Sequence, residues 1–306
     1  MTKRTGPLPA VVVNSARVGD AARLRERCER AAAAAGWDRP LVFPTTPNDA
    51  GVRPASQAIE AGAALVIVVG GDGTVRACAE VLAGTDVPMA IVPVGSANLT
   101  ARALAIPGRL GAALAVAFNG LNRRIDLGEA DGAVFAAMAG IGLDAAVVGA
   151  AHRVAKRLAG WSAYAVAATG QLLRRPVTFT IRLDDGEPLT RRAHCVTVGN
   201  SGALPGGFGI MPDAVVDDGW LDVLVLAPHG PLGWAEVGYR VALGSRRDDA
   251  QLERLRAAAV EIRVAEPAVS LPRQVDGELI GPASALTVRV LPGALLVRVP
   301  SASEPG

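Results

Sequence analysis

An aspartate stands among glycines in the segment GGDGT, residues 70–74, directly after an apolar run at residues 66–69. The run is β-branched and predicts a strand buried on both faces of a parallel sheet. Glycines let backbone N–H groups approach a bulky anion, and the helical pattern from Val75 onward directs a helix N-terminus at the same place. A carboxylate beside phosphates requires a cation between them, so Asp72 predicts a magnesium nucleotide. A tight turn without a ligand is the alternative.

A second turn of small residues, Gly95 to Ala97, follows the apolar run at residues 89–92 and precedes Asn98. The hydroxyl of Ser96 and the amide of Asn98, both at a helix N-terminus, suit phosphate oxygens or a ribose. Ordinary helix capping by the same side chains is the alternative. Two such turns at successive strand ends favour the nucleotide.

Strand and helix patterns alternate around these turns, from residue 8 to about residue 125. Strands are predicted at residues 8–13, 41–43, 65–69 and 89–92, and helices at residues 20–35, 56–61, from 75, around 101 and at 111–118. This alternation is typical of a doubly wound α/β domain, which binds its ligands at the carboxyl ends of the strands.

The pattern changes after Asp126 to short strands separated by Gly, Pro and Asp. These strands predict an antiparallel sandwich or roll, with helices only near residues 145–173 and 231–243. The segment LPGA, residues 291–294, is typical of a hairpin turn between the last two strands.

The chain of 306 residues is long enough for two ordinary domains. We expect an α/β nucleotide-binding domain at residues 1–125 and a β-rich substrate domain at residues 126–306, whose extreme C-terminal segment can return to the first domain. The net charge of +2 is too small for a general nucleic-acid binder, so no nucleic-acid partner is expected. No apolar run approaches the roughly 20 residues of a membrane span, and the N-terminal apolar stretch is too short for a secretory signal. These features predict a cytoplasmic protein.

The cysteines and histidines do not suggest a metal centre. Cys28, Cys78 and Cys195 are widely spaced and contain no CxxC pair, so neither a disulfide nor zinc is expected. The histidines, His152, His194 and His229, also lack the spacing of metal ligands.

Six segments in a fixed order resemble the diacylglycerol kinase catalytic-domain family, which includes bacterial lipid kinases, sphingosine kinases and ceramide kinases. The segments are GGDGT at 70–74, PVGSANLTAR at 93–102, RRIDLGEADGAVFAAMAGIGLDAAVV at 123–148, KRLAGWSAY at 156–164, DDGWLDV at 217–223 and QVDGEL at 274–279. The resemblance covers nearly the whole chain. It implies an ATP-dependent lipid kinase with an α/β nucleotide domain and a β-rich lipid domain, and a phosphatidic-acid-like product from a diacylglycerol-like substrate.

The resemblance also implies roles for particular residues. Glu278 would be the general base, and Asp72 and Asp126 would hold the Mg²⁺ network on ATP. Asp218 would bind a second, structural Mg²⁺ together with backbone carbonyls near Val215 and Trp220. The implied nucleotide-binding residues are Asn14, Thr45, Gly70, Gly71, Asp72, Gly73, Thr74, Gly95, Ser96 and Asn98.

Two positions depart from the family pattern. The first loop is NSARVG, residues 14–19, where the family has Asn-Pro-x-Ser-Gly, which weakens the assignment of Asn14. Leu99 stands where many members carry an aspartate, so one carboxylate of the magnesium network is missing or supplied from elsewhere.

Other functions remain open beside the lipid kinase. NAD kinases and phosphofructokinases share the GGDG turn, but the segments that follow it differ here, so a lipid substrate is favoured. A catalytically inactive nucleotide-binding regulator, marked by Leu99, is opposed by the intact Asp72, Asp126 and Glu278. A Rossmann-type oxidoreductase is weaker still, because GGDGT lacks the GxGxxG spacing.

A basic and aromatic segment at residues 152–175 suggests how the chain reaches a lipid. His152, Arg153, Lys156 and Arg157 precede Trp161 and Tyr164, and Arg174 and Arg175 end the segment. This pattern predicts peripheral contact with an anionic membrane. A solvated helix with core aromatics is the alternative, and a homodimer is left open.

Overall fold

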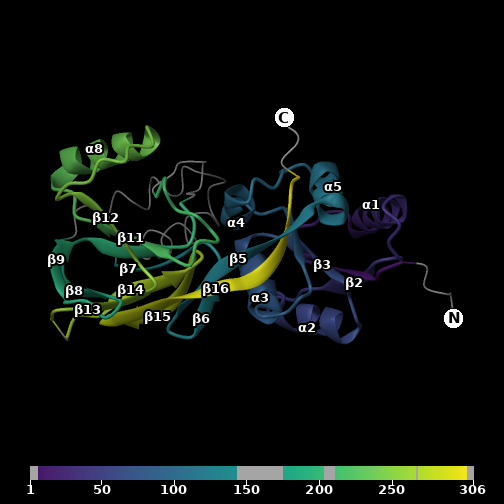
Figure 1. Cartoon of the computed structure of the whole chain (residues 1–306), viewed down its shortest axis with the longest axis horizontal. Coiled ribbons are helices and arrows are strands. Elements are labelled where there is room, and N and C mark those ends of the chain that lie inside the picture. Colours follow the sequence, from purple (N-terminus) through teal and green to yellow (C-terminus); the bar gives the residue numbers. More distant parts are fainter. Residues whose placement is uncertain (1–5, 143–174, 203–210, 267, 302–306) are drawn as a thin grey trace. The chain divides into compact units, whose positions relative to one another are not determined.

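The computed structural model describes residues 6–142, 175–202, 211–266 and 268–301 (Figure 1). The chain divides into two compact units, Met1–Ile125 with Gly293–Gly306 and Asp126–Pro292. Two long strands, β5 (Leu121–Ala130) and β16 (Ala285–Val299), contribute residues to both units. The helix predicted near 145–173 and the membrane segment up to Arg174 lie outside the described residues.

The first unit contains a parallel sheet. Its strand order is β2 (Leu41–Pro44), β1 (Pro9–Val13), β3 (Leu65–Gly70) and β4 (Met89–Pro93). Every residue of β1 and β3 is buried, as expected of apolar, β-branched central strands. The end of β16 adds a parallel strand beside β4, with Val297 opposite Met89.

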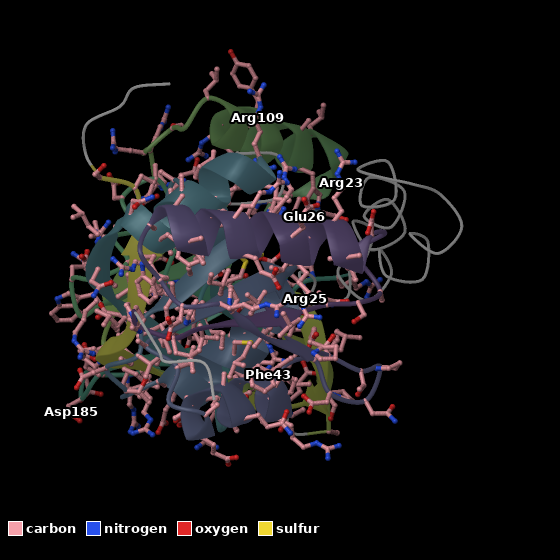
Figure 2. The ribbon with its side chains drawn as sticks, turned by 90° about the vertical axis from the view of Figure 1, so that its right-hand side faces the viewer. Arg23, Arg25, Glu26, Phe43, Arg109 and Asp185 are labelled. Atoms are coloured by element: carbon pink, nitrogen blue, oxygen red, sulfur yellow. The ribbon has the colours of Figure 1, made fainter. Side chains whose placement is uncertain are left out.

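Helices cover this sheet: α1 (Ala21–Ala34), α2 (Val52–Glu60), α3 (Asp72–Leu82), α4 (Leu99–Ala103) and α5 (Leu110–Asn119). Figure 1 shows α1 and α5 on one side of the strands and α2 and α3 on the other, which confirms the doubly wound fold. The carboxylate of Asp20 accepts the Arg23 N–H at 2.9 Å and starts α1. Leu24 faces the core, whereas Arg23 and Glu26 are exposed (Figure 2).

Two helices start earlier than predicted. The helix predicted from Val75 is α3, which begins at Asp72, so the end of the predicted glycine turn is helical. The sequence predicts a helix from residue 56, but α2 begins at Val52. Pro54 lies in the first turn, where the missing N–H breaks no helical hydrogen bond, so the proline does not prevent the earlier start.

The second unit is a sandwich of two antiparallel sheets. One has the order β9 (Leu189–Ala193), β8 (Val177–Leu183), β13 (Ala259–Val264) and the first part of β16. The other has the order β12 (Leu252–Ala257), β11 (Leu221–Leu226), β10 (Cys195–Gly199), β7 (Met138–Gly142), β14 (Leu271–Val275) and β15 (Glu278–Ala283). The short β6 (Ala133–Phe135) pairs with β5. Fully buried side chains of both sheets, such as Ile181 and Val196, share one core, which confirms the predicted sandwich.

The hairpin predicted at residues 291–294 is wrong. The strand β16 continues through LPGA without reversing. Gly293 has a φ of 56°, and the next carbonyl, that of Ala294, accepts the Gly84 N–H at 2.7 Å. Pro292 and Gly293 therefore distort β16 only locally. The hydrogen bond from the Gly84 N–H holds the strand extended at this point.

All three cysteines are buried, and none of them forms a disulfide bond. Burial raises the pKa of the Cys28 thiol to about 11 and that of Cys78 to about 12. Thiols of such high pKa are poor nucleophiles, so these two are structural residues.

Helix α8 (Gly230–Ala242) lies over the second sheet of the sandwich (Figure 1). Its residues Val237 and Val241 join a core cluster with Leu224 of β11 and Leu252 of β12. Among the described residues, no helix combines the length and apolar character that a membrane crossing demands.

Candidate functional site

The GGDGT segment contains the last residue of β3, the N-cap Gly71 and the first residues of α3. Gly71 is the N-cap of α3 and provides no side-chain cap, and its carbonyl accepts the N–H groups of Thr74 and Val75, both at 3.0 Å. A Cβ at Gly70 would lie 2.6 Å from the Cβ of Thr74, so only glycine fits there. The first turn of α3 thus has no capping side chain, which suits an anionic ligand such as phosphate.

The second turn packs against the first. A Cβ at Gly95 would lie 2.6 Å from the Cα of Gly71 and 2.7 Å from Oδ1 of Asn98. Asn98 has a left-handed backbone with φ of 50°, and its amide side chain both accepts the Gly95 N–H at 2.9 Å and donates to the Gly95 carbonyl at 2.8 Å. Asn98 therefore shapes this turn, while the Ser96 side chain is exposed.

The side chain of Asp72 connects the two turns through hydrogen bonds. One carboxylate oxygen accepts the backbone N–H of Asn98 at 2.8 Å, and the other accepts that of Leu99 at 2.6 Å. Burial raises the pKa of Asp72, although the backbone hydrogen bonds act in the opposite direction. A carboxylate has about four lone-pair sites. The backbone N–H groups of Thr100 and of Asp72 itself also favour the charged carboxylate. Backbone donors therefore already face these sites, and Asp72 could accept from a hydrated metal ion only in place of some of them.

Two further predicted residues lie at the same edge of the sheet. Asn14 follows β1 and donates from Nδ2 to the Thr74 hydroxyl at 3.0 Å. Thr45 follows β2, and its N–H donates to the Val13 carbonyl at 2.8 Å. The predicted nucleotide residues of the first unit thus all lie at or after the carboxyl ends of β1 to β4, which form the ligand-binding edge of doubly wound sheets.

Asp126 is almost fully buried in the second unit, at 2% exposure. Its Oδ2 accepts the Gly219 N–H at 2.7 Å, and its backbone N–H donates to the Val216 carbonyl at 2.7 Å. Asn200 donates from Nδ2 to the Asp126 carbonyl at 2.7 Å. The structure therefore places Asp126 against the DDGW loop, which carries the residues predicted for the second Mg²⁺.

The predicted metal ligand Asp218 has other partners. One oxygen forms an ion pair with Arg256, and the other accepts the Trp220 N–H at 3.1 Å. The Arg256 guanidinium also lies 5.8 Å from the centre of the Trp220 ring, and both Val215 and Trp220 are exposed. The described residues contain no group of three metal-ligating side chains. Because a guanidinium already faces the carboxylate, this loop does not fit a metal ion well, and the second Mg²⁺ stays a prediction.

Glu278 lies at the start of β15, beside a hairpin turn with positive φ at Asp276 and Gly277. Asp276 is buried, and its carboxylate accepts three backbone N–H groups, those of Ala136 and Met138 at 2.8 Å and of Ala137 at 2.9 Å. Its own N–H donates to the Met138 carbonyl at 2.8 Å. This network fixes the turn that carries Glu278.

Asp276 is a functional candidate that the sequence reasoning missed. Gln274 adds a second support, because its side chain accepts the Gly277 N–H at 2.8 Å. The sequence does contain an Asp-Gly pair, Asp276-Gly277, which is typical of a tight hairpin turn. That signal predicts the turn but not the distant backbone that Asp276 binds.

Two family models match the chain. The diacylglycerol kinase catalytic domain matches residues 9–130, and the YegS C-terminal NAD kinase beta sandwich-like domain matches residues 137–299. A "Probable lipid kinase YegS-like" of Pseudomonas fluorescens is 33% identical over 274 residues, which are 88% of either chain. A "Diacylglycerol kinase" of Mycobacterium tuberculosis is 30% identical over 250 residues, 79% of either chain.

A solved structure shows the same fold. A diacylglycerol kinase of Bacillus anthracis superimposes with a TM-score of 0.73 over 99% of this chain and 100% of its own, at 21% identity. The matches extend over both units, and the sequence identity to the curated relatives is sufficient to establish kinship. The chain therefore belongs to the diacylglycerol kinase catalytic-domain family of lipid kinases, with a C-terminal domain of the YegS type.

Proposed function

We propose that this chain transfers the γ-phosphoryl group of ATP to the hydroxyl of a diacylglycerol-like lipid, giving ADP and a phosphatidic-acid-like product. The observation that carries the proposal is the pair of glycine turns that Asp72 joins at the carboxyl ends of β3 and β4. An uncapped helix N-terminus, with a carboxylate beside it, has the donors and the acceptor that a magnesium nucleotide requires. The names of the curated relatives support the lipid acceptor.

Three parts of the chain would act in this reaction: the N-terminus of α3, Asp72 and Glu278. The N-terminus of α3 would bind phosphate oxygens, and Asp72 would accept from the hydrated metal. Mg²⁺, when bound, would neutralise charge on the transferring phosphoryl group. Glu278 would accept the proton of the lipid hydroxyl while the new O–P bond forms and the bond from the γ-phosphorus to ADP breaks.

The three hydrogen bonds to the Asp276 carboxylate fix the turn that carries Glu278. The position of Glu278 therefore does not depend on a flexible loop. This matters because a general base acts efficiently only within hydrogen-bond reach of the proton it removes.

The test is a screen of lipid alcohols with labelled ATP, using the parent and Glu278→Gln. The proposal expects a labelled phospholipid from diacylglycerol with the parent, and a loss of at least about a hundredfold in kcat with Glu278→Gln. Nucleotide binding by the variant should stay within a factor of about two of the parent. Labelled NADP⁺ from NAD⁺, with no labelled lipid, would indicate a soluble-substrate kinase instead. Nucleotide binding without any turnover would indicate an inactive regulator.

A further inference from the structure

Three strands of the second sheet end or begin next to the turn that carries Glu278. Strand β10 ends at Gly199, β7 begins at Met138 and β14 ends at Val275. Because β7 is the antiparallel neighbour of both other strands, these three strand ends lie at the same end of the sheet. Glu278 lies there too, since it is opposite Val275.

Asn200 continues β10 at this end and reaches the other sheet of the sandwich. Its backbone N–H donates to the Ala137 carbonyl at 2.9 Å, which extends the pairing of β10 with β7 by one residue. Its side-chain Nδ2 donates to the Asp126 carbonyl at 2.7 Å, and Asp126 belongs to β5, which pairs with strands of the first sheet. Asn200 therefore joins the two sheets, with its backbone on one and its side chain on the other.

The segment 136–138 links Asn200 to the Glu278 turn. Its three backbone N–H groups donate to the Asp276 carboxylate, whereas the Ala137 carbonyl accepts the N–H of Asn200. Ala137 is thus bound by Asp276 on one side and by Asn200 on the other. A shift of Asn200 would reach the Glu278 turn through a single short segment.

Asn200 also completes the contacts that hold Asp126. The Asp126 N–H donates to Val216 and its carboxylate accepts from Gly219, so the DDGW loop binds two of its groups. Asn200 binds a third group, the Asp126 carbonyl. Of these contacts, the one from Asn200 is connected to the Glu278 turn through Ala137. Asn200 therefore lies between the residue predicted for the magnesium network and the predicted base.

Stability alone does not explain an amide at this position. Asn200 is 1% exposed, and among the described residues its Oδ1 has no hydrogen-bond partner. A buried acceptor without a donor costs at least as much free energy as an ordinary hydrogen bond contributes, so Oδ1 offsets what Nδ2 gains. An apolar side chain would fill the space without that cost. The remaining advantage of the amide is the placement of Asp126.

We propose that Asn200 is a positioning residue that holds Asp126 and the turn of Glu278 in a fixed relation to each other. The proposal rests on the proposed function, because it takes Glu278 as the base and Asp126 as part of the magnesium network. A base and a metal-binding carboxylate must act on the same phosphoryl transfer, so a small displacement between them lowers the rate. Asn200 acts through these two residues and need not touch the substrate.

The first test measures hydrogen–deuterium exchange of the full chain and needs no substrate. Asn200→Ala removes the Nδ2 donor, so we expect exchange at least about fivefold faster in residues 216–219 and also in residues 136–138. The matched control is Ser201→Ala. Ser201 is buried as well, its hydroxyl has no hydrogen-bond partner among the described residues, and alanine keeps the N–H that donates to Ala137 at 3.3 Å. The control should exchange within about twofold of the parent in both segments.

A second variant separates positioning from space filling. Asn200→Leu fills the position with another γ-branched side chain but supplies no donor, so it should exchange as fast as Asn200→Ala. It also decides the outcome where the alanine variant fails to fold. Exchange at the level of the parent with leucine would show that Asn200 only fills space. Faster exchange in residues 216–219 alone would confine Asn200 to the DDGW loop. Either result would overturn the proposal.

Kinetics then measure what the fixed relation contributes. With a diacylglycerol as acceptor, Asn200→Leu should lower kcat at least about tenfold and raise the half-saturating Mg²⁺ concentration, with KM for ATP at saturating Mg²⁺ within about twofold of the parent. Ser201→Ala should keep all three values. An unchanged kcat in a variant whose two segments exchange faster would also overturn the proposal. A parent without lipid turnover would count against the proposed function, whereas the exchange measurement tests the link between Asp126 and the Glu278 turn on its own.

Discussion

The carboxylate of Asp72 accepts the backbone N–H of Leu99 at 2.6 Å. Leu99 occupies the position where many members of the family carry an aspartate, and its side chain is buried. This chain therefore has a buried apolar side chain where those members have a carboxylate. The hydrogen bond from the backbone of residue 99 to Asp72, which connects the two turns, is still present. Asp72 orders the two turns and, under the proposed function, would also accept from a hydrated metal ion, so its two roles can be separated only by measuring stability and activity together.

We expect Asp72→Asn to lower both the thermal midpoint and kcat. The amide keeps one acceptor but turns an NH₂ group toward a backbone N–H, and a lost bond to a charged acceptor costs about 1.5–3 kcal/mol. Melting curves and turnover of labelled ATP measure the two effects. Asp20→Asn is the matched control, because asparagine caps a helix as well as aspartate does and α1 should be unaffected. Full activity of Asp72→Asn would contradict its assignment to the nucleotide site.

Gly95→Ala should weaken nucleotide binding and stability together. The added methyl group would lie 2.6 Å from the Cα of Gly71, so one of the two turns must move. We expect a loss of at least about 1–3 kcal/mol in the free energy of unfolding and a higher KM for ATP. Gly111→Ala, in α5, is the control, since its Cβ would meet nothing within 4 Å and alanine favours helix. Equal behaviour of the two variants would show that the packing of the turns is not required.

The strands and helices of the first unit were predicted well from the sequence, because each is specified by residues that lie close together in the chain. The buried run at β3 and the glycines after it define a strand, a turn and a helix within a few residues of one another. Residues that act over long distances could not be predicted in this way. Asp276 binds Ala136, 140 residues earlier, and Arg256 reaches Asp218 over 38 residues. Such partners depend on how the sandwich strands pair, which alternation within one strand does not specify.

Asp276→Asn should disturb the turn that carries Glu278. Asparagine tolerates the left-handed backbone, with φ of 45°, but its NH₂ group would face one of the three backbone N–H groups that the carboxylate binds. We expect a lower thermal midpoint and a fall in kcat with little change in KM for ATP. Asp184→Asn is the control: Asp184 also has a left-handed backbone, with φ of 49°, and its Oδ1 accepts two backbone N–H groups, which an asparagine oxygen can replace. A change in stability with unchanged kcat would limit Asp276 to a structural role.

Asp222 should make stability depend on pH. Burial, and to a lesser extent the charge of Asp213, raise the pKa of Asp222 from 3.8 to about 6. Between these values the folded chain keeps a proton that the unfolded chain has lost, so the free energy of unfolding falls as pH rises through this window. Asp222→Asn should therefore raise the thermal midpoint near pH 8 and change it little near pH 3.5. Asp185→Asn, at an exposed position (Figure 2), is the matched control.

Arg256 should hold the DDGW loop without help from a metal. Its guanidinium pairs with Asp218 and lies over Trp220, and partly exposed contacts of these kinds contribute up to about 1 kcal/mol each. We expect Arg256→Ala to lower the thermal midpoint by about 2–4 °C, while a chelator leaves the midpoint of the parent unchanged. Once the guanidinium is removed, Asp218 is free to accept a cation, so added Mg²⁺ should stabilise Arg256→Ala more than the parent. A parent chain that loses stability in chelator and regains it with Mg²⁺ would instead place a structural metal at Asp218, as the family resemblance implies.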